Sequence, residues 1–310
     1  MVRCFSVRTW QPVLSGYRIK TYASRWCPGF QLLVVHYISA QEKNIVSDER
    51  YSRQSFLGPH AQERIECAVI GIVGLGGGGS HIVQQLAHVG FQQYVLYDPD
   101  CVEDHNLNRM VGATEADVKE ARPKVEVALR IIRGLQQQAL VETYRKQWQE
   151  EPLPLRRCDL LFGCVDGVGN RRDLEAAARR YLIPYIDIGL DVHQAGTEPP
   201  VMAGQVVLSM PGNPCMHCLG VLQEKALEQE GRRYGDAGPR PQVVWTNGVL
   251  ASTAVGIAID LLTDWTRQLR PPVYLQYFGN EGTMQPSPRL TFAPKTCIHY
   301  PTTDIGDPEI

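Results

Sequence analysis

The chain has 310 residues, of which 44% are hydrophobic and 21% are charged, so it can bury a sizeable core without disulfide or metal staples. Its 31 basic and 33 acidic residues leave a formal net charge of -2 at pH 7. This balance gives no electrostatic reason to expect nucleic acid or an anionic membrane as the main partner. A phosphate compound needs only a local positive site and stays possible.

The cysteines and the apolar runs indicate the compartment. Nine cysteines are spread along the chain, and an odd number in a long chain argues against a disulfide framework and for a reducing compartment. No apolar run approaches the roughly 18 residues that span a bilayer. The segment 30–40 is too short and too far from the start for a signal peptide. We therefore expect a cytoplasmic protein.

The chain divides into three parts. Residues 1–46 show no clear periodicity, and we expect an N-terminal extension of unknown role. From 47 to 300 short apolar runs rich in β-branched residues alternate with stretches of helical spacing, and a tail follows over 301–310. The expected strands are 67–73, 94–97, 140–144, 159–164, 185–188 and 204–210, with two more near Tyr274 and Leu290. One expected helix starts near residue 82. A second covers 115–132, where Pro123 marks an interruption or a new start, and two more cover 171–180 and 248–262.

The order of these elements predicts the fold. Strands alternating with helices predict an α/β domain with a Rossmann-like, doubly wound and mostly parallel sheet. The late strands predict a C-terminal antiparallel extension. The polar stretch 223–242 is expected to be a helix followed by a loop.

A glycine-rich turn lies between the first strand and the first helix. It lets the backbone turn tightly and approach a ligand, while the helix that follows presents free N–H groups to phosphate. Asp98, about 20 residues later, is placed to accept hydrogen bonds from ribose hydroxyls. On its own this pattern fits NAD(P) or FAD as well as ATP. The glycines of the turn are Gly74, Gly76, Gly77, Gly78 and Gly79.

The residues after Asp98 distinguish these nucleotides. Residues 98–109, Asp-Pro-Asp-Cys-Val-Glu-Asp-His-Asn-Leu-Asn-Arg, resemble the D-x-D-x-V-x-x-x-N-L-x-R pattern of the ThiF/MoeB and ubiquitin-activating superfamily. Arg53, Lys124 and Asp166 match further motifs of this family in the right order. The resemblance covers roughly residues 47–300.

The resemblance implies an ATP- and Mg²⁺-dependent adenylyltransferase. Its substrate would be the C-terminal carboxylate of a ubiquitin-like (β-grasp) protein or a peptide, with release of pyrophosphate. Joining two anions requires positive charge around the phosphates, which Arg109 and Lys124 would supply. Asp166 would hold Mg²⁺ through its carboxylate. Arg53 would reach across a homodimer into the neighbouring site, and Arg171 matches a family position near the site. The implied nucleotide-binding set is Gly74, Gly76, Gly77, Gly79, Asp98, Asp100, Asn106, Arg109 and Lys124.

Two of these residues also have a purely structural interpretation. Asp166 alone can cap the helix that follows it, and Asn106 alone can serve a turn. Their occurrence together with Asp98, Arg109 and Lys124 favours a site.

A second group of residues points to a metal. Cys215-Met-His-Cys218 matches the first half of the four-cysteine zinc site that many family members carry, but Cys297-Ile-His299 offers only one cysteine for the second half. Together these four residues can form a structural Cys₃His zinc site, although Cys-x-His is awkward spacing for two ligands of one ion. The alternative is a degraded site that packs without metal.

The loop before the late helix departs from the pattern. Family members that form a thioester or a persulfide carry a cysteine there, whereas this chain has Val244 at about that position. The loop over 238–248 is similar to that of bacterial ThiF-type proteins. We therefore expect the acyl-adenylate to be passed on without a thioester in this loop.

Other interpretations stay open. A full activating enzyme can use a different cysteine, such as Cys101 or Cys27. An NAD-dependent oxidoreductase and a non-catalytic nucleotide-binding partner protein are the remaining alternatives. Cys67 and Cys164 lie in apolar runs and are expected to be inert core residues.

Overall fold

The structure is a computed structural model that describes residues 49–194, 197–222, 241–269, 271–295 and 297–300. The expected extension over 1–46, the tail over 301–310 and nearly all of the polar stretch 223–242 lie outside the described residues. The domain boundaries stay predictions.

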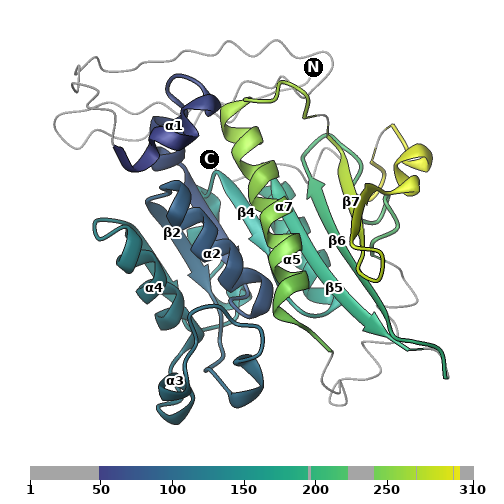
Figure 1. Cartoon of the computed structure of the whole chain (residues 1–310). Helices are drawn as coiled ribbons and strands as arrows, with labels where there is room; N and C mark the ends of the chain where they lie inside the picture. The colour runs from purple at the N-terminus through teal and green to yellow at the C-terminus, as the bar shows by residue number, and fades with distance from the viewer. Residues whose placement is uncertain (1–48, 195–196, 223–240, 270, 296, 301–310) are drawn as a thin grey trace.

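One eight-stranded sheet organises the described chain (Figure 1), with the strand order β3-β2-β1-β4-β5-β6-β7-β8. The pairs from β3 to β5 are parallel, and those from β5 to β8 are antiparallel. This arrangement confirms the predicted Rossmann-like sheet with its antiparallel extension. The strands are β1 Val69–Val73, β2 Gln93–Tyr97, β3 Leu140–Tyr144, β4 Leu160–Gly163, β5 Tyr185–His193, β6 Val201–Ser209, β7 Val273–Phe278 and β8 Thr283–Pro286.

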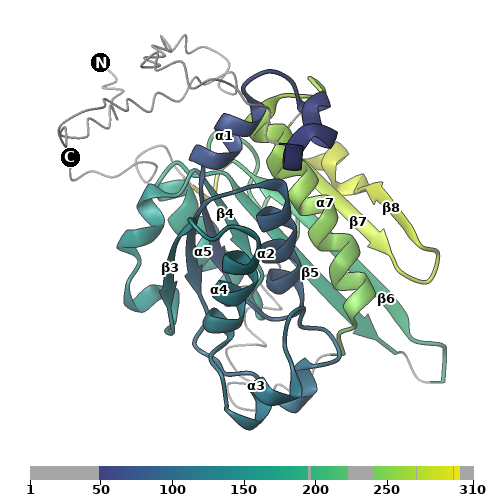
Figure 2. The same ribbon diagram turned by 60° about the vertical axis from the view of Figure 1, so that its left-hand side comes forward.

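Helices cover both faces of the sheet (Figures 1 and 2). The helices α1, α2, α4 and α7 pack on one face and share one hydrophobic core, while α5 and the loop over 210–222 close a second core on the other face. Strands buried on both faces read as continuous apolar runs, as β1 does. The helices are α1 Ala61–Cys67, α2 Gly77–Val89, α3 Glu115–Lys119, α4 Lys124–Leu135, α5 Val168–Arg180 and α7 Val244–Thr263, and the 3₁₀ segments are η1 Glu49–Leu57, η2 Asp104–Asn106, η3 Trp148–Glu150, η4 Leu153–Arg157 and η5 Pro288–Phe292.

Several boundaries differ from the sequence-based expectation. The first long helix, α2, begins at Gly77 instead of near residue 82, because the glycines themselves form its first turn. Pro123 separates α3 from α4 and so marks a new start. The strand expected near Leu290 is wrong, since Leu290 lies in η5. The last strand ends at Pro286, because proline cannot donate to a ladder.

The helix α7 is more apolar than the sequence analysis allowed. By length and composition it is the one helix in the described part of the chain that qualifies as a membrane span, which overturns the expectation that no apolar run is long enough. Half of its apolar window is buried inside the domain, where Leu250, Ala254 and Ala258 join the core beside α2. This burial is the pattern of a core helix.

A buried carboxylate orders the segment between β2 and β3. The Asp117 side chain is 1% exposed, and it accepts hydrogen bonds from Arg130 Nη1 at 2.8 Å and Nη2 at 2.7 Å. The Arg122 Nε lies 2.7 Å from the same carboxylate. Asp117 also closes a capping box with Thr114. These contacts tie α3 to α4, which begins with Lys124.

We expect Asp117→Asn to lower the free energy of unfolding by about 2–4 kcal/mol at pH 7, because it leaves two arginines without their buried partner. Hydrogen bonds from Arg130 hold the pKa of the Asp117 carboxyl well below its usual range. Because the carboxyl pKa is lower in the folded state than in the unfolded state, the ionised carboxylate stabilises the fold at pH values above the unfolded pKa of about 4. This stabilisation is lost progressively as the pH falls below that value. Urea unfolding should therefore show a gap between wild type and variant that shrinks below about pH 4. A gap that is absent at pH 7 contradicts this role.

Candidate functional site

A polar pocket of about 250 Å³ lies at the carboxyl ends of β1, β2 and β4. Because β2 and β4 leave β1 on opposite sides, this is the switch point of the sheet, where ligands bind in open α/β folds. Most of the residues that the sequence analysis singled out for the nucleotide line this pocket, although Gly79 and Arg53 do not. The predicted site residues that line the pocket are Gly74, Gly76, Gly77, Asp98, Asp100, Asn106, Arg109, Lys124 and Asp166.

The glycine turn needs glycine because backbone approaches backbone. Gly74 has a φ of +88°, and a Cβ built on it would lie 2.4 Å from the Cys164 carbonyl oxygen. A Cβ on Gly79 would lie 1.9 Å from the Gly74 carbonyl oxygen. Gly79 therefore packs behind the turn. Its place in the motif is explained by this packing.

The glycine turn places the N-terminus of α2 at the pocket. No side chain in the described part of the chain caps this terminus, whose N-cap residue is Gly76. The first N–H groups of a helix have no intrahelical partner, and together with the helix dipole they attract an anion. The pocket therefore has a ready site for phosphate.

Asp98 fixes the turn from the end of β2. Its Oδ2 accepts a hydrogen bond from the Leu75 N–H at 2.7 Å, and its Oδ1 accepts one from the Asp100 N–H at 2.9 Å. Burial raises the pKa of Asp98, and the charge of Lys124 opposes that rise. Each oxygen retains a second lone pair. Asp98 thus holds the backbone in place and can also accept a ribose hydroxyl.

Lys124 is placed at the start of α4, where a cation is disfavoured by the helix dipole. Its Nζ lies 2.8 Å from Asp100 Oδ2 and 3.9 Å from Asp98 Oδ1, so these two carboxylates hold the charge there. Lys124 is nearly buried, with a side chain 11% exposed. Lys124 therefore brings a nearly buried cation to the pocket wall.

Arg109 and Asn106 come from the short segment after β2. Arg109 Nη1 donates to the His105 carbonyl oxygen and to Asn108 Oδ1, the latter at 3.0 Å, which turns the guanidinium to the pocket wall. Asn106 is buried, and its Oδ1 accepts a hydrogen bond from the Glu103 N–H at 3.0 Å. Asn106 therefore serves a turn, as its structural interpretation expected, and it also lines the pocket.

Asp166 lies at the exposed mouth of the pocket, directly after β4. Its nearest polar side-chain partner is Gln242, whose Nε2 lies 3.4 Å from Asp166 Oδ1. Among the residues that the structure describes, no lysine or arginine forms a salt bridge with it. An exposed carboxylate beside an amide offers the oxygen ligands that Mg²⁺ prefers.

Behind Arg171, a pocket-lining residue that the sequence analysis named, lie two buried partners that it missed, Asp187 and Tyr185. Arg171 Nη1 lies 2.5 Å from Asp187 Oδ2, and the Tyr185 hydroxyl donates to Asp187 Oδ1 at 2.9 Å. Asp187 is fully buried; burial raises the pKa of its carboxyl and the Arg171 charge opposes that rise. A carboxylate inside the apolar run of β5 was the available signal, because such residues are seldom buried without a partner.

Arg53 lies at the opposite end of the domain from the pocket. It is exposed on η1, which is held against the C-terminal end of α2 by a 2.9 Å hydrogen bond from Gln54 Nε2 to the Val89 carbonyl oxygen. The pocket is at the N-terminal end of the same helix. Arg53 therefore cannot serve the pocket of its own chain.

The four predicted metal ligands converge. Their ligand atoms all lie within 4.8 Å of one another; Cys215 Sγ and Cys218 Sγ are 3.6 Å apart, and His299 Nδ1 lies 3.4 Å and 3.3 Å from these two sulfurs. Bond lengths of about 2.0–2.3 Å around a tetrahedral zinc imply ligand separations of about 3.5–3.8 Å. The separations among Cys215, Cys218 and His299 are close to these values, and Cys297 Sγ lies within 4.8 Å of the other three ligand atoms, so the Cys-x-His spacing does not keep the fourth ligand out of reach.

The remaining described cysteines differ among themselves. Cys67 is exposed at the end of α1, so its prediction as a core residue is wrong; the strand begins two residues later. Burial raises the pKa of the Cys164 thiol at the pocket floor. Cys101 follows Asp100, and its Sγ lies 3.1 Å from Arg145 Nη2. Cys27 lies outside the described residues.

Comparisons with known proteins identify the family of the chain. The family model described as "ThiF family" matches residues 50–297. The SAMP-activating enzyme E1 of Haloferax volcanii is 31% identical over 176 residues, covering 55% of this chain and 61% of that protein. The sulfur carrier protein ThiS adenylyltransferase of Escherichia coli is 30% identical over 205 residues, covering 64% of this chain and 76% of that protein.

A structural comparison gives the same fold. A crystal structure of Escherichia coli MccB with ATP aligns with a TM-score of 0.64 and 20% identity, covering 77% of this chain and 71% of that one. The chain spans only 50–63% of the length of the first curated relatives it matches.

We expect Gly79→Ala to lower the free energy of unfolding by about 2–4 kcal/mol, because the new Cβ meets the Gly74 carbonyl oxygen and the turn must move. The matched control is Gly134→Ala in α4, where nothing lies within 4 Å of the added Cβ. There alanine should stabilise the helix by about 0.5–1 kcal/mol. Urea unfolding of both variants measures the difference. Equal effects of the two substitutions contradict the packing described for the turn.

Proposed function

The chain belongs to the ThiF family, and on that premise we propose that it is an ATP-dependent adenylyltransferase for the C-terminal carboxylate of a ubiquitin-like protein or a peptide. One observation carries the proposal. The uncapped N-terminus of α2 and the side chains of Arg109, Lys124 and Arg171 meet in one pocket beside the exposed carboxylate of Asp166. This is a site for a polyanion and a divalent cation.

The residues of the pocket fit the chemistry of adenylation. The substrate carboxylate attacks the α-phosphate of ATP, the bond to the β-phosphate breaks, and pyrophosphate leaves. A carboxylate is already ionised at neutral pH, so the attack needs no general base. The demand on the protein is to bring two anions together, which Arg109, Lys124 and the α2 terminus meet by neutralising charge. Asp166 and the amide of Gln242 would hold Mg²⁺, which supplies further neutralisation when bound.

The proposed substrate follows from the names of the relatives. The Escherichia coli relative is named for a sulfur carrier protein, and the Haloferax relative is named an activating enzyme E1. Leu190 of β5, Gln242 just before α7 and Asn247 in the first turns of α7 all line the pocket. The choice of a protein or peptide C-terminus therefore rests on the names of these relatives.

We propose that the acyl-adenylate passes directly to a nucleophile on another protein. Val244, which the sequence analysis placed in the loop before the late helix, is the first residue of α7 and is 40% exposed, so this position offers no thiol. A second candidate is a thioester on Cys101, favoured by its contact with Arg145 and its place next to Asp100 at the pocket. A covalent adduct that thiol reagents release and that Cys101→Ser abolishes would identify the second candidate.

We further propose that the functional unit is a homodimer built on α7. Residues 244–259 contain no charged side chain, yet one stripe of this helix faces outward. Trp245 is 60% exposed and Val249 is 37% exposed, and Ser252 and Gly256 continue the exposed stripe. Such a stripe, at spacings of four, three and four residues, is the form of a helix-packing face. A second copy of the chain would cover it.

A two-fold axis through this stripe would bring Arg53 to the neighbouring pocket. The stripe starts near the pocket at Trp245, and α7 runs roughly 30 Å from there to its end at Thr263. Just past that end, the ring of Trp265 packs edge-on against Phe56 with centroids 5.3 Å apart. Phe56 and Arg53 belong to the same segment η1. In an isologous, antiparallel pairing of α7 with its copy, each η1 lies at the partner's pocket. The position of Arg53 far from its own pocket supports this arrangement.

The cysteine cluster is proposed as a structural zinc site. Three thiols and one imidazole whose ligand atoms all lie within 4.8 Å of one another match the ligand set of closed zinc sites, and all four positions would be filled by protein. The cluster does not line the nucleotide pocket. Zinc there would join the loop over 215–218 to the segment over 297–299 and take no part in the reaction.

We expect ATP–pyrophosphate exchange that depends on one β-grasp protein from the same genome. Asp166→Ala should reduce the exchange rate by at least about 100-fold, because the phosphates lose their metal ligand. The matched control is Asp173→Ala, which removes an exposed carboxylate from α5 outside the pocket and should leave the rate unchanged. ATP binding without exchange for any partner would favour a non-catalytic binding protein, and failure to bind ATP would overturn the proposal.

Mixed dimers test the role of Arg53. Arg53→Ala and Asp166→Ala should each inactivate the homodimer, since every site then lacks one residue. Mixing the two variants should restore about a quarter of the wild-type exchange rate, because half of the dimers carry one complete site. If Arg53 acts on its own chain, no activity returns on mixing. A chain that is monomeric by sedimentation while fully active would also contradict the arrangement.

A further inference from the structure

Two charged residues of α5 are buried without any part in the nucleotide pocket. Glu175 is 0% exposed and Arg179 is 1% exposed, and Arg179 Nε lies 3.4 Å from Glu175 Oε1 across one helical turn. Removing two charges from water is costly, and a single contact at this distance offsets little of that cost. Their other partners therefore explain why they are retained.

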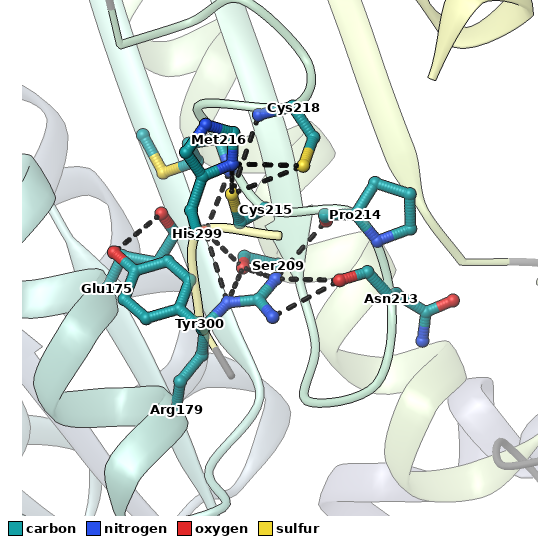
Figure 3. A network of polar contacts seen from close by, with 10 residues as sticks. All are labelled: Glu175, Arg179, Ser209, Asn213, Pro214, Cys215, Met216, Cys218, His299 and Tyr300. Atoms are coloured by element: carbon teal, nitrogen blue, oxygen red, sulfur yellow. Dashed lines mark hydrogen bonds and ion pairs between the residues drawn. The ribbon is translucent and has the colours of Figure 1, made fainter. Parts of the chain in front are cut away.

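The pair holds the loop that carries the first two cysteines (Figure 3). Glu175 Oε1 accepts a hydrogen bond from the Met216 N–H at 2.9 Å, inside the Cys-x-x-Cys turn. Arg179 donates to the carbonyl oxygens of Asn213 and Pro214, at 3.1 Å from Nη2 to the first and 3.2 Å to the second. The backbone on both sides of Cys215 is thus fixed by one ion pair.

Ser209 completes this half of the network. Its hydroxyl donates to Glu175 Oε1 at 2.5 Å and accepts from Arg179 Nη2 at 2.8 Å. Because Ser209 is the last residue of β6, the ion pair is tied to the sheet as well as to the loop. With these contacts the carboxylate and the guanidinium are both well satisfied.

The same pair also holds the segment that carries the other two ligands. The Tyr300 hydroxyl donates to Glu175 Oε2 at 3.4 Å, and Arg179 Cζ lies 5.1 Å from the centroid of the Tyr300 ring, within the range of a cation–π contact. Tyr300 follows His299 directly. In Figure 3 the ring of Tyr300 lies beside Glu175 and Arg179, and the ring of His299 lies beside Cys215 and Cys218.

We propose that Glu175 and Arg179 are positioning residues that preform the metal site. They join its two halves, about 80 residues apart in the sequence, to a single turn of α5 before any ion binds. This inference rests on the zinc site proposed above. Metal ligands fixed by outer hydrogen bonds need little reorganisation on binding, and loss of such support typically weakens metal affinity by about 10–100-fold.

The test uses the full-length protein with a double substitution, Glu175→Met with Arg179→Met. Replacing both members of a buried ion pair with apolar groups of similar size is often neutral for stability, so the variant should fold. We expect its Zn²⁺ affinity, measured by competition with a chromogenic chelator, to fall by about 10–100-fold. The visible spectrum of the Co²⁺-substituted protein should lose its tetrahedral thiolate signature. Arg180→Met, on the exposed side of α5, is the matched control and should behave as wild type.

The outcomes separate this inference from the zinc proposal. Wild-type protein that binds neither Zn²⁺ nor Co²⁺ overturns the metal site itself and the inference with it. Wild-type protein that binds, together with a double variant of unchanged affinity and spectrum, overturns the inference alone. If the double variant does not fold, Tyr300→Ala replaces it, because it releases only the 297–299 half. An affinity reduced by about tenfold supports the inference and an unchanged affinity contradicts it.

Discussion

The site depends on the buried carboxylate of Asp98. With one oxygen on the Leu75 N–H and the other on the Asp100 N–H, it joins the glycine turn after β1 to the segment after β2. The turn then directs the open end of α2 into the pocket, and Asp100 anchors Lys124 at the start of α4. The buried Asp98 carboxylate therefore positions the groups that would bind a polyphosphate. The positive charge of Lys124 favours the ionised form of Asp98, which burial in a low-dielectric environment disfavours.

The helix α7 links the pocket to the rest of the molecule. Its first turn lines the pocket through Asn247, its inner face packs on the sheet and α2, and its outer face is uncharged. A helix that is apolar all round needs cover on all sides, and the domain covers only half of it. The same property explains why its composition resembles a membrane span. The proposed second copy of the chain would cover the exposed half and bring Arg53 to each pocket.

Sequence reasoning was sufficient for the fold and for most of the pocket, since strand periodicity and the motif over 98–109 both depend on local pattern. It did not find features set by contacts distant in the sequence. Gly79 supports the turn from behind, and Asp187 is a buried partner whose role depends on Arg171. The ion pair of Glu175 with Arg179 has helical spacing typical of a solvated surface pair, so nothing local distinguishes it from one. The 3₁₀ segment at 288–292 was missed because proline ended the strand early.

Transfer of an oxygen atom tests adenylation most directly. A β-grasp substrate whose C-terminal carboxylate carries a heavy oxygen isotope is incubated with the protein, ATP and hydroxylamine, and the nucleotide product is analysed by mass spectrometry. If the carboxylate attacks the α-phosphate, the acyl–oxygen bond later breaks and AMP leaves with one heavy oxygen. Unlabelled AMP would contradict this mechanism, and so would ADP accompanied by labelled phosphate, because the carboxylate would then have attacked the γ-phosphate.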